Sequence, residues 1–345
     1  MNDPIGRVQE AMRRLGAGEP VVLAAATEDS DGHLIAAAQL ATTPTVAYLV
    51  RHGSGLVFAA LTEADCENLS LPPMAGHGSA DIGVEYMVSV DAVDGIGTGI
   101  SAADRATTLR RLAAPTSRPG SFCRPGHVIP TRAHPGGVLR RRSPTEAAVD
   151  LIGMAGLHPA GALTALVSRV DPTSTAGVTE SVRFAQDEGL QWVSVSDVVA
   201  YRRATESHVQ QTFTLHQDTP RGGYCIAGFR SDASGIDYIT YRFGDQTGDR
   251  SAIVLQRQSL DAEPLLNAVG EIDIDIEAHV AGTVLIVQCG EVSGQLDDIC
   301  ADIAEVVDCL GISTPVFGGD FRRSSLEQLC SSVGSRTVLS AHPGR

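Results

Sequence analysis

The chain has 345 residues, of which 43% are hydrophobic and 19% are charged. This length suggests two domains, each long enough to bury a core of its own. The 26 basic and 41 acidic residues give a formal net charge of −15, which argues against a broad nucleic-acid-binding surface, because such surfaces are basic. No uncharged apolar run approaches the ~20 residues that a membrane-spanning helix requires.

Every basic side chain is arginine, and the absence of lysine excludes Schiff-base chemistry and a P-loop lysine. The seven cysteines are scattered without CxxC spacing, which indicates reduced thiols rather than a disulfide framework or a zinc knuckle. The opening segment MNDPIGRVQEAMRRLG lacks the apolar region of a secretory signal. A cytoplasmic location is therefore expected.

The first part of the chain alternates expected strands and helices with glycine-rich turns. Apolar residues at helical spacing predict a helix over 4–16, and residues 102–113 and the segments PTEAAVDLIGMAGL and VTESVRFAQDEGL also read as helices. Strands are predicted at 20–26 and 84–93. Residues 115–143 are rich in proline, glycine and arginine, so a long ordered loop is expected there. This order predicts a mixed α/β sandwich.

A change of pattern near residues 204–212 predicts a domain boundary, which divides the chain into residues 1–204 and 205–345. The second part contains strand-like segments such as TFTLHQ and DYITYRFG, followed by the helix-like segment LDDICADIAEVVDCLG. We therefore expect it to be a smaller α+β domain.

Four segments of the first part carry distinctive motifs: RHGSG (51–55), TGISAADR (98–105), RPGHVIPTRAHPGGVLRRR (124–142) and TEAAVDLIGMAGLHPAG (145–161). Together, and in this order, they resemble the 3,4-dihydroxy-2-butanone 4-phosphate synthase family of riboflavin biosynthesis. The resemblance spans roughly residues 5–203 and implies that family's α/β/α sandwich. In the second part, TPRGGYCIAGFRSDASGIDYI resembles a shortened GTP cyclohydrolase II domain, the usual fusion partner.

The resemblance implies that the chain binds a pentulose phosphate such as ribulose 5-phosphate and converts it into dihydroxybutanone phosphate and formate. That reaction needs a divalent metal ion for the vicinal oxygens, and acid–base groups for enolisation and rearrangement. The family's catalytic histidine in RPGHV matches His127, and its phosphate-binding arginine and threonine match Arg141 and Thr145. The resemblance also implies a homodimer with the active site at its interface.

The residues themselves also indicate an anion site. Arg140, Arg141 and Arg142 lie beside a helix start in an acidic protein, and guanidinium groups offer a planar donor fork to phosphate. Backbone N–H groups at a helix N-terminus also favour anions. An ordinary solvated turn is the alternative interpretation. The predicted substrate-binding residues are Arg141, Arg142, Ser143, Thr145, Glu28 and Asp29.

Two positions depart from the family's catalytic pattern. Pro144 stands where the family has a metal-ligating histidine, and proline offers no donor atom for a metal. Ala165, within PAGALTAL, stands where the family has a catalytic glutamate.

The family's acidic loop departs as well, because it becomes TEDSDGH (27–33). Glu28 falls at the position of its arginine, Asp29 at its metal-binding glutamate and His33 at its final aspartate. Asp29 is thus the remaining candidate metal ligand, and magnesium is expected to bind weakly. His33 joins His127 as a candidate acid–base group. A polar hairpin loop and a surface histidine are the alternatives.

The second domain lacks the zinc-binding signature of a cyclohydrolase. The segment LNAVGEIDIDIEAHVAG occupies its place without a cysteine, so we expect neither bound zinc nor GTP cyclohydrolase II activity. The favoured hypothesis is a divergent synthase-family protein that binds a pentulose phosphate with weak or altered lyase chemistry. One alternative is a catalytically inactive paralogue that acts as a binding or assembly partner. The other is a functional synthase with substituted metal ligands.

Overall fold

The structure is a computed structural model, and it describes residues 3–24, 30–74, 84–219, 222–243, 250–258, 283–289, 296–310, 312 and 314–319. Its internal contacts divide the chain into two compact units, Met1–Thr205 and Glu206–Arg345.

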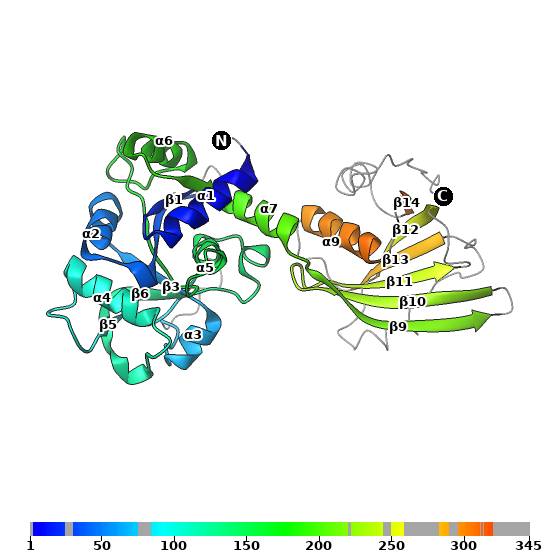
Figure 1. Ribbon diagram of the computed structural model, residues 1–345, viewed down its shortest axis with the longest axis horizontal. Helices are drawn as coiled ribbons and strands as arrows, with labels where there is room; N and C mark the ends of the chain where they lie inside the picture. Colours follow the sequence, from blue (N-terminus) through cyan, green and yellow to red (C-terminus); the bar gives the residue numbers. More distant parts are fainter. Residues whose placement is uncertain are drawn as a thin grey trace. The chain divides into compact units, whose positions relative to one another are not determined.

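A mixed sheet of eight strands forms the centre of the described part of unit 1 (Figure 1). The strands follow the order β4-β6-β3-β7-β2-β1-β8, and β5 also pairs with β6. They are β1 (Val21–Ala24), β2 (His33–Ala37), β3 (Val57–Leu61), β4 (Glu85–Tyr86), β5 (Val90–Ala92), β6 (Phe122–Arg132), β7 (Gly161–Ala165) and β8 (Trp192–Ser194). The β1–β8 and β3–β6 pairs are parallel, and the other pairs are antiparallel.

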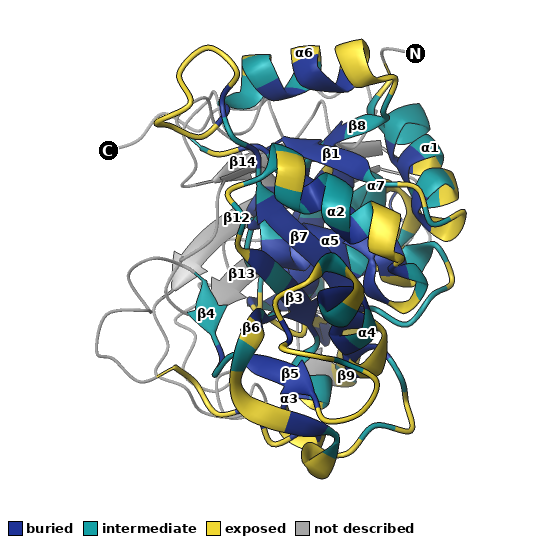
Figure 2. Cartoon of the chain, turned by 90° about the vertical axis from the view of Figure 1, so that its left-hand side faces the viewer, coloured by how far each residue is buried: buried dark blue, intermediate teal, exposed yellow. Residues whose placement is uncertain are grey.

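Helices cover both faces of this sheet, so its central strands are buried (Figure 2). Val22 and Leu34 pack in one core with side chains of α2, α4 and α6, whereas the next residues, Leu23 and Ile35, point to the opposite face. On that face α1, α5 and α7 pack against one another. The helices are α1 (Pro4–Gly16), α2 (Thr43–His52), α3 (Glu63–Asn68), α4 (Ala102–Leu112), α5 (Pro144–Met154), α6 (Val178–Glu188) and α7 (Val195–Thr205). This arrangement confirms the predicted α/β fold, with a sheet between layers of helices.

Short polar side chains cap the N-termini of two of these helices, directly before the helical segments that the sequence predicts. The Asp3 side chain accepts hydrogen bonds from the backbone N–H groups of Ile5 and Gly6 at the start of α1. Ser101 caps α4 by accepting from the N–H of Asp104 at 3.1 Å. The predicted helices over 4–16 and 102–113 are therefore present within one residue of their expected ends.

The structure corrects two expectations. Residues 84–93 do not form one strand but two short ones, β4 and β5. Residues 115–143 are not only a loop, because they contain the 11-residue strand β6. Pro125 and Pro130 count against a central strand, but β6 pairs with β3 on one side and with β4 and β5 on the other. Pairing with neighbouring strands therefore determines the conformation of β6 more strongly than its local amino-acid composition does.

The described part of unit 2 is a smaller α+β arrangement, as expected. Its sheet follows the order β14-β12-β13-β11-β10-β9 (Figure 1). The strands are β9 (Val209–Thr219), β10 (Gly222–Ser231), β11 (Asp237–Phe243), β12 (Arg250–Gln258), β13 (Thr283–Cys289) and β14 (Thr314–Gly319). Helix α9 (Leu296–Cys309) packs Ile299 and Val306 into one core with Phe229 and Tyr238. The segment LNAVGEIDIDIEAHVAG lies outside the described residues.

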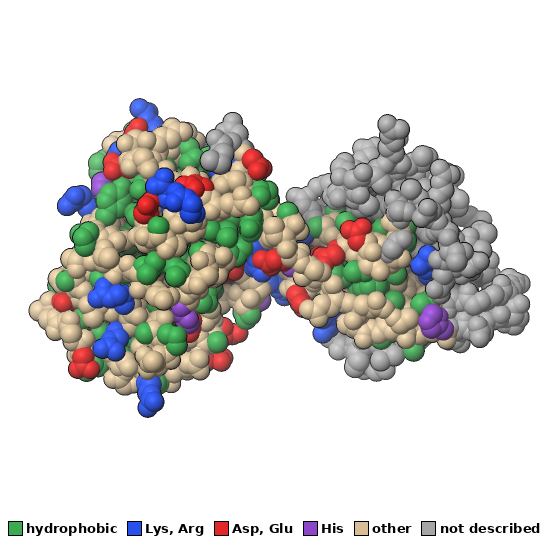
Figure 3. Space-filling model, in the orientation of Figure 1, with side chains coloured by type: hydrophobic (Ala, Val, Ile, Leu, Met, Phe, Trp, Pro, Cys, Tyr) green, Lys and Arg blue, Asp and Glu red, His purple; other side chains and the backbone are tan. Residues whose placement is uncertain are grey.

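Arginine and acidic side chains are scattered over the face of unit 1 that Figure 3 shows, and they do not gather there into one basic patch. Within the described ranges, every helix is too short or too polar to cross a membrane.

Candidate functional site

His127 and Asp91 form a hydrogen-bonded pair on neighbouring strands, β6 and β5. The Nδ1 atom of His127 lies 2.6 Å from Oδ2 of Asp91, and the backbone N–H of His127 donates to Oδ1 at 2.9 Å. Asp91 is buried, with 6% of its side chain exposed, whereas 39% of the His127 side chain is exposed. A carboxylate only accepts, so Nδ1 of His127 is the donor in this hydrogen bond, and Nε2 is the other ring nitrogen. The pair therefore presents an oriented imidazole to a ligand.

The TGISAADR motif surrounds this pair. Gly99 has a φ of +89°, and a Cβ atom there would lie 2.1 Å from Oδ2 of Asp91 and 2.7 Å from Nδ1 of His127. Only glycine allows the backbone to pass so close in this conformation. Asp104, in the first turn of α4, fixes the loop by accepting from the N–H groups of Gly97 at 3.1 Å and Gly99 at 3.0 Å.

Asp91 is a candidate site residue that the sequence did not predict. It lies in the segment VEYMVSVDAV, which was expected to be a strand and nothing more. A carboxylate between apolar neighbours such as Val90 and Ala92 is costly to bury without a partner, and this is the signal that points to Asp91. Its partner His127 is 36 residues away in the sequence, so local spacing does not reveal the pair.

A buried glutamate organises the start of α5. Ser143 is the N-cap residue and Pro144 occupies the first turn. Glu146 is fully buried and accepts hydrogen bonds from the N–H of His134 at 2.9 Å, Nε of Arg141 at 2.5 Å and the Ser143 hydroxyl. The S-P-T-E sequence therefore builds a well-capped helix start at the predicted anion site.

The Arg141 side chain contacts the start of α5 and is also partly exposed to solvent. Its Nη2 atom donates to the Arg132 carbonyl at 2.5 Å and also pairs with Glu146, while 27% of its side chain is exposed. Nε and Nη2 are thus engaged, and Nη1 is the nitrogen with no hydrogen bond to a described residue. Arg140 is exposed and Arg142 is half-buried beside it.

The two predicted hydroxyl ligands lie inside the protein. Thr145 is 2% exposed, and its hydroxyl donates to Oγ1 of Thr131 at 3.3 Å. Ser143 is also buried, and its Oγ accepts from the N–H of Thr145 at 3.2 Å. The structure thus brings Arg141, Ser143 and Thr145 together, but the two hydroxyl groups have protein partners.

His33 lies directly beside Ala165, the position at which the resemblance implies a catalytic glutamate. It begins β2, and its partner across the antiparallel β2–β7 pair is Ala165. Directly opposed residues place their side chains on one face of a sheet, with Cβ atoms about 5 Å apart. Nδ1 of His33 lies 3.0 Å from the Asp31 carbonyl, and burial lowers the pKa of His33. His33 thus lies next to Ala165, and its burial disfavours the charged form of the imidazole.

His33 and His127 lie at the same end of the sheet but are not in contact. The strand order places β7 and β3 between β2 and β6. Three strand spacings of about 4.8 Å separate their backbones by roughly 14 Å. The two predicted acid–base groups are therefore separate.

The residues at the start of α5 do not fit a magnesium ion. Pro144 has no donor atom, and the carboxylate of Glu146 is engaged within the protein. Among the described residues, no three His, Cys, Asp or Glu side chains are grouped so that they could hold a metal ion. Glu28 and the candidate ligand Asp29 lie outside the described residues.

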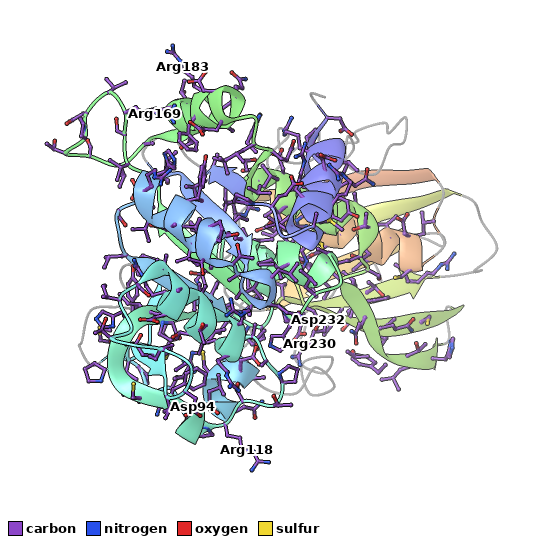
Figure 4. The ribbon with its side chains drawn as sticks, turned by 60° about the vertical axis from the view of Figure 1, so that its left-hand side comes forward. Asp94, Arg118, Arg169, Arg183, Arg230 and Asp232 are labelled. Atoms are coloured by element: carbon purple, nitrogen blue, oxygen red, sulfur yellow. The ribbon has the colours of Figure 1, made fainter. Side chains whose placement is uncertain are left out.

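A small cavity of about 250 Å³ lies elsewhere, between α6 and the segment that follows β7. Leu166, Phe184 and Arg169 line it, together with Arg183, which points outward from α6 (Figure 4). Arg169 stacks over the Phe184 ring at 4.4 Å and pairs with Glu188 at 2.5 Å. None of the predicted site residues that the structure describes lines this cavity.

The family model of 3,4-dihydroxy-2-butanone 4-phosphate synthase matches residues 9–201, which is more than half of the chain. The chain belongs to this family. The riboflavin biosynthesis protein RibBA of Salinispora tropica is 44% identical over 250 residues, covering 72% of this chain. Because unit 1 has 205 residues, this similarity continues into unit 2. The chain spans 62%, 59% and 58% of the length of three such relatives.

Solved structures of the synthase family share this fold. RibBX, a two-domain 3,4-dihydroxy-2-butanone 4-phosphate synthase from A. baumannii, is 25% identical with a TM-score of 0.73, covering 98% of this chain and 100% of its own. A synthase solved in complex with two magnesium ions is 38% identical with a TM-score of 0.54, covering 57% of this chain and 97% of its own. Magnesium is thus a ligand of that family member.

Proposed function

We propose that the chain is a divergent synthase-family protein that binds a pentulose phosphate, with the family's lyase chemistry weak or altered. The observation that carries this proposal is the Asp91–His127 pair, which gives unit 1 an oriented and accessible imidazole. Family membership supports a sugar phosphate as the ligand class.

The pair has the geometry of a general base. Nε2 of His127 takes a proton from a carbon atom next to a carbonyl group, which is the enolisation that a ketose phosphate undergoes. Asp91 holds the ring through Oδ2, accepts from the backbone N–H of His127 through Oδ1, and stabilises the imidazolium ion that forms. His127 is therefore the proposed catalytic residue, and Asp91 positions it.

The phosphate site is proposed at the turn before α5. Arg140, Arg141 and Arg142 bring three positive charges there, and the buried Glu146 brings one negative charge, so the turn remains positive. Nη1 of Arg141 is directed to the ligand in this proposal, while its other nitrogens hold Glu146. Such a site needs no metal to hold a phosphate dianion.

The magnesium-dependent part of the reaction is proposed to be weak. Pro144 removes a ligand, and the S-P-T-E start replaces it with a favourable helix beginning. Functional residues commonly lower the stability of a protein. Here a residue that favours the helix start stands in place of a functional one. Ala165 removes a carboxylate in addition, and His33 is proposed as the acid–base group that occupies the adjacent position.

Formate release from ribulose 5-phosphate tests this proposal. With magnesium present, the chain should release formate at least 100-fold more slowly than the magnesium-bound synthase relative, since one acid–base group typically contributes about 10²–10⁴-fold. His127→Gln should abolish the remaining rate. A magnesium-dependent rate close to that of the relative would instead establish a functional synthase with substituted ligands.

A second candidate function is a catalytically inactive binding or assembly partner. The same departures at Pro144 and Ala165 favour it, and a homodimer through unit 1 is proposed in both cases. The two functions differ in ligand binding, because only the first requires affinity for a sugar phosphate.

Unit 2 is proposed to be cyclohydrolase-like without zinc. One zinc per purified chain, or formate release from GTP, would contradict that proposal.

A further inference from the structure

The backbone carbonyl of Asp31 sets the hydrogen-bonding roles of the two ring nitrogens of His33. It lies 3.0 Å from Nδ1 of His33, and a carbonyl oxygen only accepts, so Nδ1 is the donor. Burial lowers the pKa of His33 and so favours the uncharged ring, in which Nε2 then carries the lone pair. The placement of the Asp31 carbonyl therefore decides which nitrogen of His33 accepts a proton.

One peptide group links His33 to the segment between β7 and α6. The carbonyl of Asp31 and the N–H of Gly32 belong to the same planar trans peptide, so they point in opposite directions. The Gly32 N–H donates to the Ala176 carbonyl at 2.8 Å, while the Asp31 carbonyl accepts from His33. A shift of the segment around Ala176 therefore turns the carbonyl that accepts from His33.

Thr175, the residue before Ala176, makes a second contact with the same turn. Its hydroxyl donates to Oδ1 of Asp31 at 2.5 Å. The backbone of Thr175 is itself held, because it pairs in an antiparallel bridge with Val167, two residues beyond the end of β7. Thr175 thus connects the Asp31 turn to the continuation of the strand that pairs with His33.

We propose that Thr175 is a positioning residue for His33: its hydroxyl holds Asp31 so that the proton stays on Nδ1 and Nε2 remains the accepting nitrogen. The inference rests on the proposed function only for the use of His33 as an acid–base group. A base beside Ala165 needs a ring nitrogen that accepts a proton, and the tautomer decides which nitrogen this is. Thr175 acts through Asp31 and touches no reacting atom.

A purely structural role of the same hydrogen bond predicts a different result. Thr175 and Asp31 are both exposed, so in that case their contact only closes the loop and adds slightly to stability. Its removal would then lower the melting temperature slightly and leave the imidazole unchanged. The tautomer of His33 is therefore the readout that separates the two roles.

The test is NMR of the full chain with ring-¹⁵N histidine and no substrate, at about pH 8, above the ordinary histidine pKa of about 6.5. The signals of His33 are assigned by their loss in His33→Gln. In the wild type, Nδ1 should be protonated and Nε2 unprotonated. In Thr175→Val, which lacks the hydroxyl, the ratio of the Nδ1–H to the Nε2–H tautomer should fall about fivefold, as expected for the loss of one hydrogen bond.

Three further variants show whether the hydroxyl group is responsible. Thr175→Ser keeps a hydroxyl and should retain the wild-type ratio. Asp31→Ala keeps the backbone carbonyl but removes the acceptor of Thr175, so it should lower the ratio as much as Thr175→Val, and combining the two should add nothing. Thr173→Val is the matched control, because the Thr173 hydroxyl donates at 2.6 Å to Asp171 in the same loop. It should leave the ratio unchanged.

A wild-type His33 ring protonated mainly on Nε2 would overturn the proposal, and so would an unchanged ratio in Thr175→Val. An equal shift in Thr173→Val would also overturn it, since the loop as a whole would then be responsible. Thr175, Asp31 and Thr173 are exposed, so their variants are expected to fold. The readout needs no ligand, so the proposed sugar-phosphate binding can fail while this inference stands.

Discussion

Replacing Arg141 with alanine should destabilise unit 1 by about 3 kcal/mol. The change leaves the fully buried Glu146 carboxylate without its cation, and removing one partner of a buried ion pair typically costs ~3–5 kcal/mol. The lower end applies because 27% of the Arg141 side chain is exposed. For a unit of this size, that loss lowers the melting temperature by roughly 6–12 °C.

Tryptophan fluorescence during thermal unfolding measures this effect in unit 1 alone, because the only tryptophan of the chain is Trp192 in β8. Arg140→Ala is the matched control, since Arg140 is exposed and its loss should change stability by less than about 0.5 kcal/mol. Adding Glu146→Gln to Arg141→Ala should recover part of the loss, because no buried charge then remains. A melting temperature unchanged by Arg141→Ala would show that Glu146 does not depend on it.

Replacing Gly99 with alanine should break the Asp91–His127 contact. A φ of +89° strains any residue with a Cβ atom, and that atom would lie 2.1 Å from Oδ2 of Asp91. The carboxylate must therefore move away from the imidazole. We expect the Nδ1 proton of His127 to exchange with water faster than in the wild type, as measured by NMR with ring-¹⁵N histidine, and unit 1 to be destabilised by roughly 2–3 kcal/mol.

Gly95→Ala is the control that separates strain from collision. Gly95 has a φ of +80° in the same loop, and a Cβ atom there would meet only Thr107, at 3.8 Å. This variant should cost about 1 kcal/mol and leave the His127 proton in place. If both variants had the same effect on that proton, the close approach of Gly99 to the pair would not matter.

The parts of the fold that the sequence predicts best are those with strong local signals. The helix over 4–16 has an aspartate cap and an apolar stripe, and the structure places α1 at Pro4–Gly16. The strand β6 escaped prediction because Pro125, Gly126 and Pro130 are poor strand residues, and only its pairing with three neighbouring strands stabilises it.

The candidate site shows the same limit. His127 and Arg141 could be predicted because a family motif contains them. Asp91 could not, since its meaning depends on a strand pairing that joins residues 36 positions apart. The pairing of His33 with Ala165 joins positions even further apart in the sequence, and it is visible only in the register of β2 and β7. Long-range contacts of this kind have no local pattern.

Two of the expected departures from the family pattern lie in described residues, and they differ in character. At α5, Pro144 gives the helix a favourable start but offers no donor atom where the resemblance implies a metal ligand. At β7, Ala165 stands where the resemblance implies a carboxylate, and His33 lies across from it. The proposed function therefore keeps proton transfer by the Asp91–His127 pair and phosphate binding before α5, and gives up the metal.

Calorimetric titration of the full chain with ribulose 5-phosphate, in magnesium and in EDTA, tests this account most directly. The account predicts measurable binding with the same affinity in both buffers, and weaker binding of inorganic phosphate. Arg141 and its neighbours hold the phosphate without a metal, and a charge-assisted contact contributes ~1.5–3 kcal/mol. Absence of binding in both buffers, or binding that requires magnesium, would contradict the account.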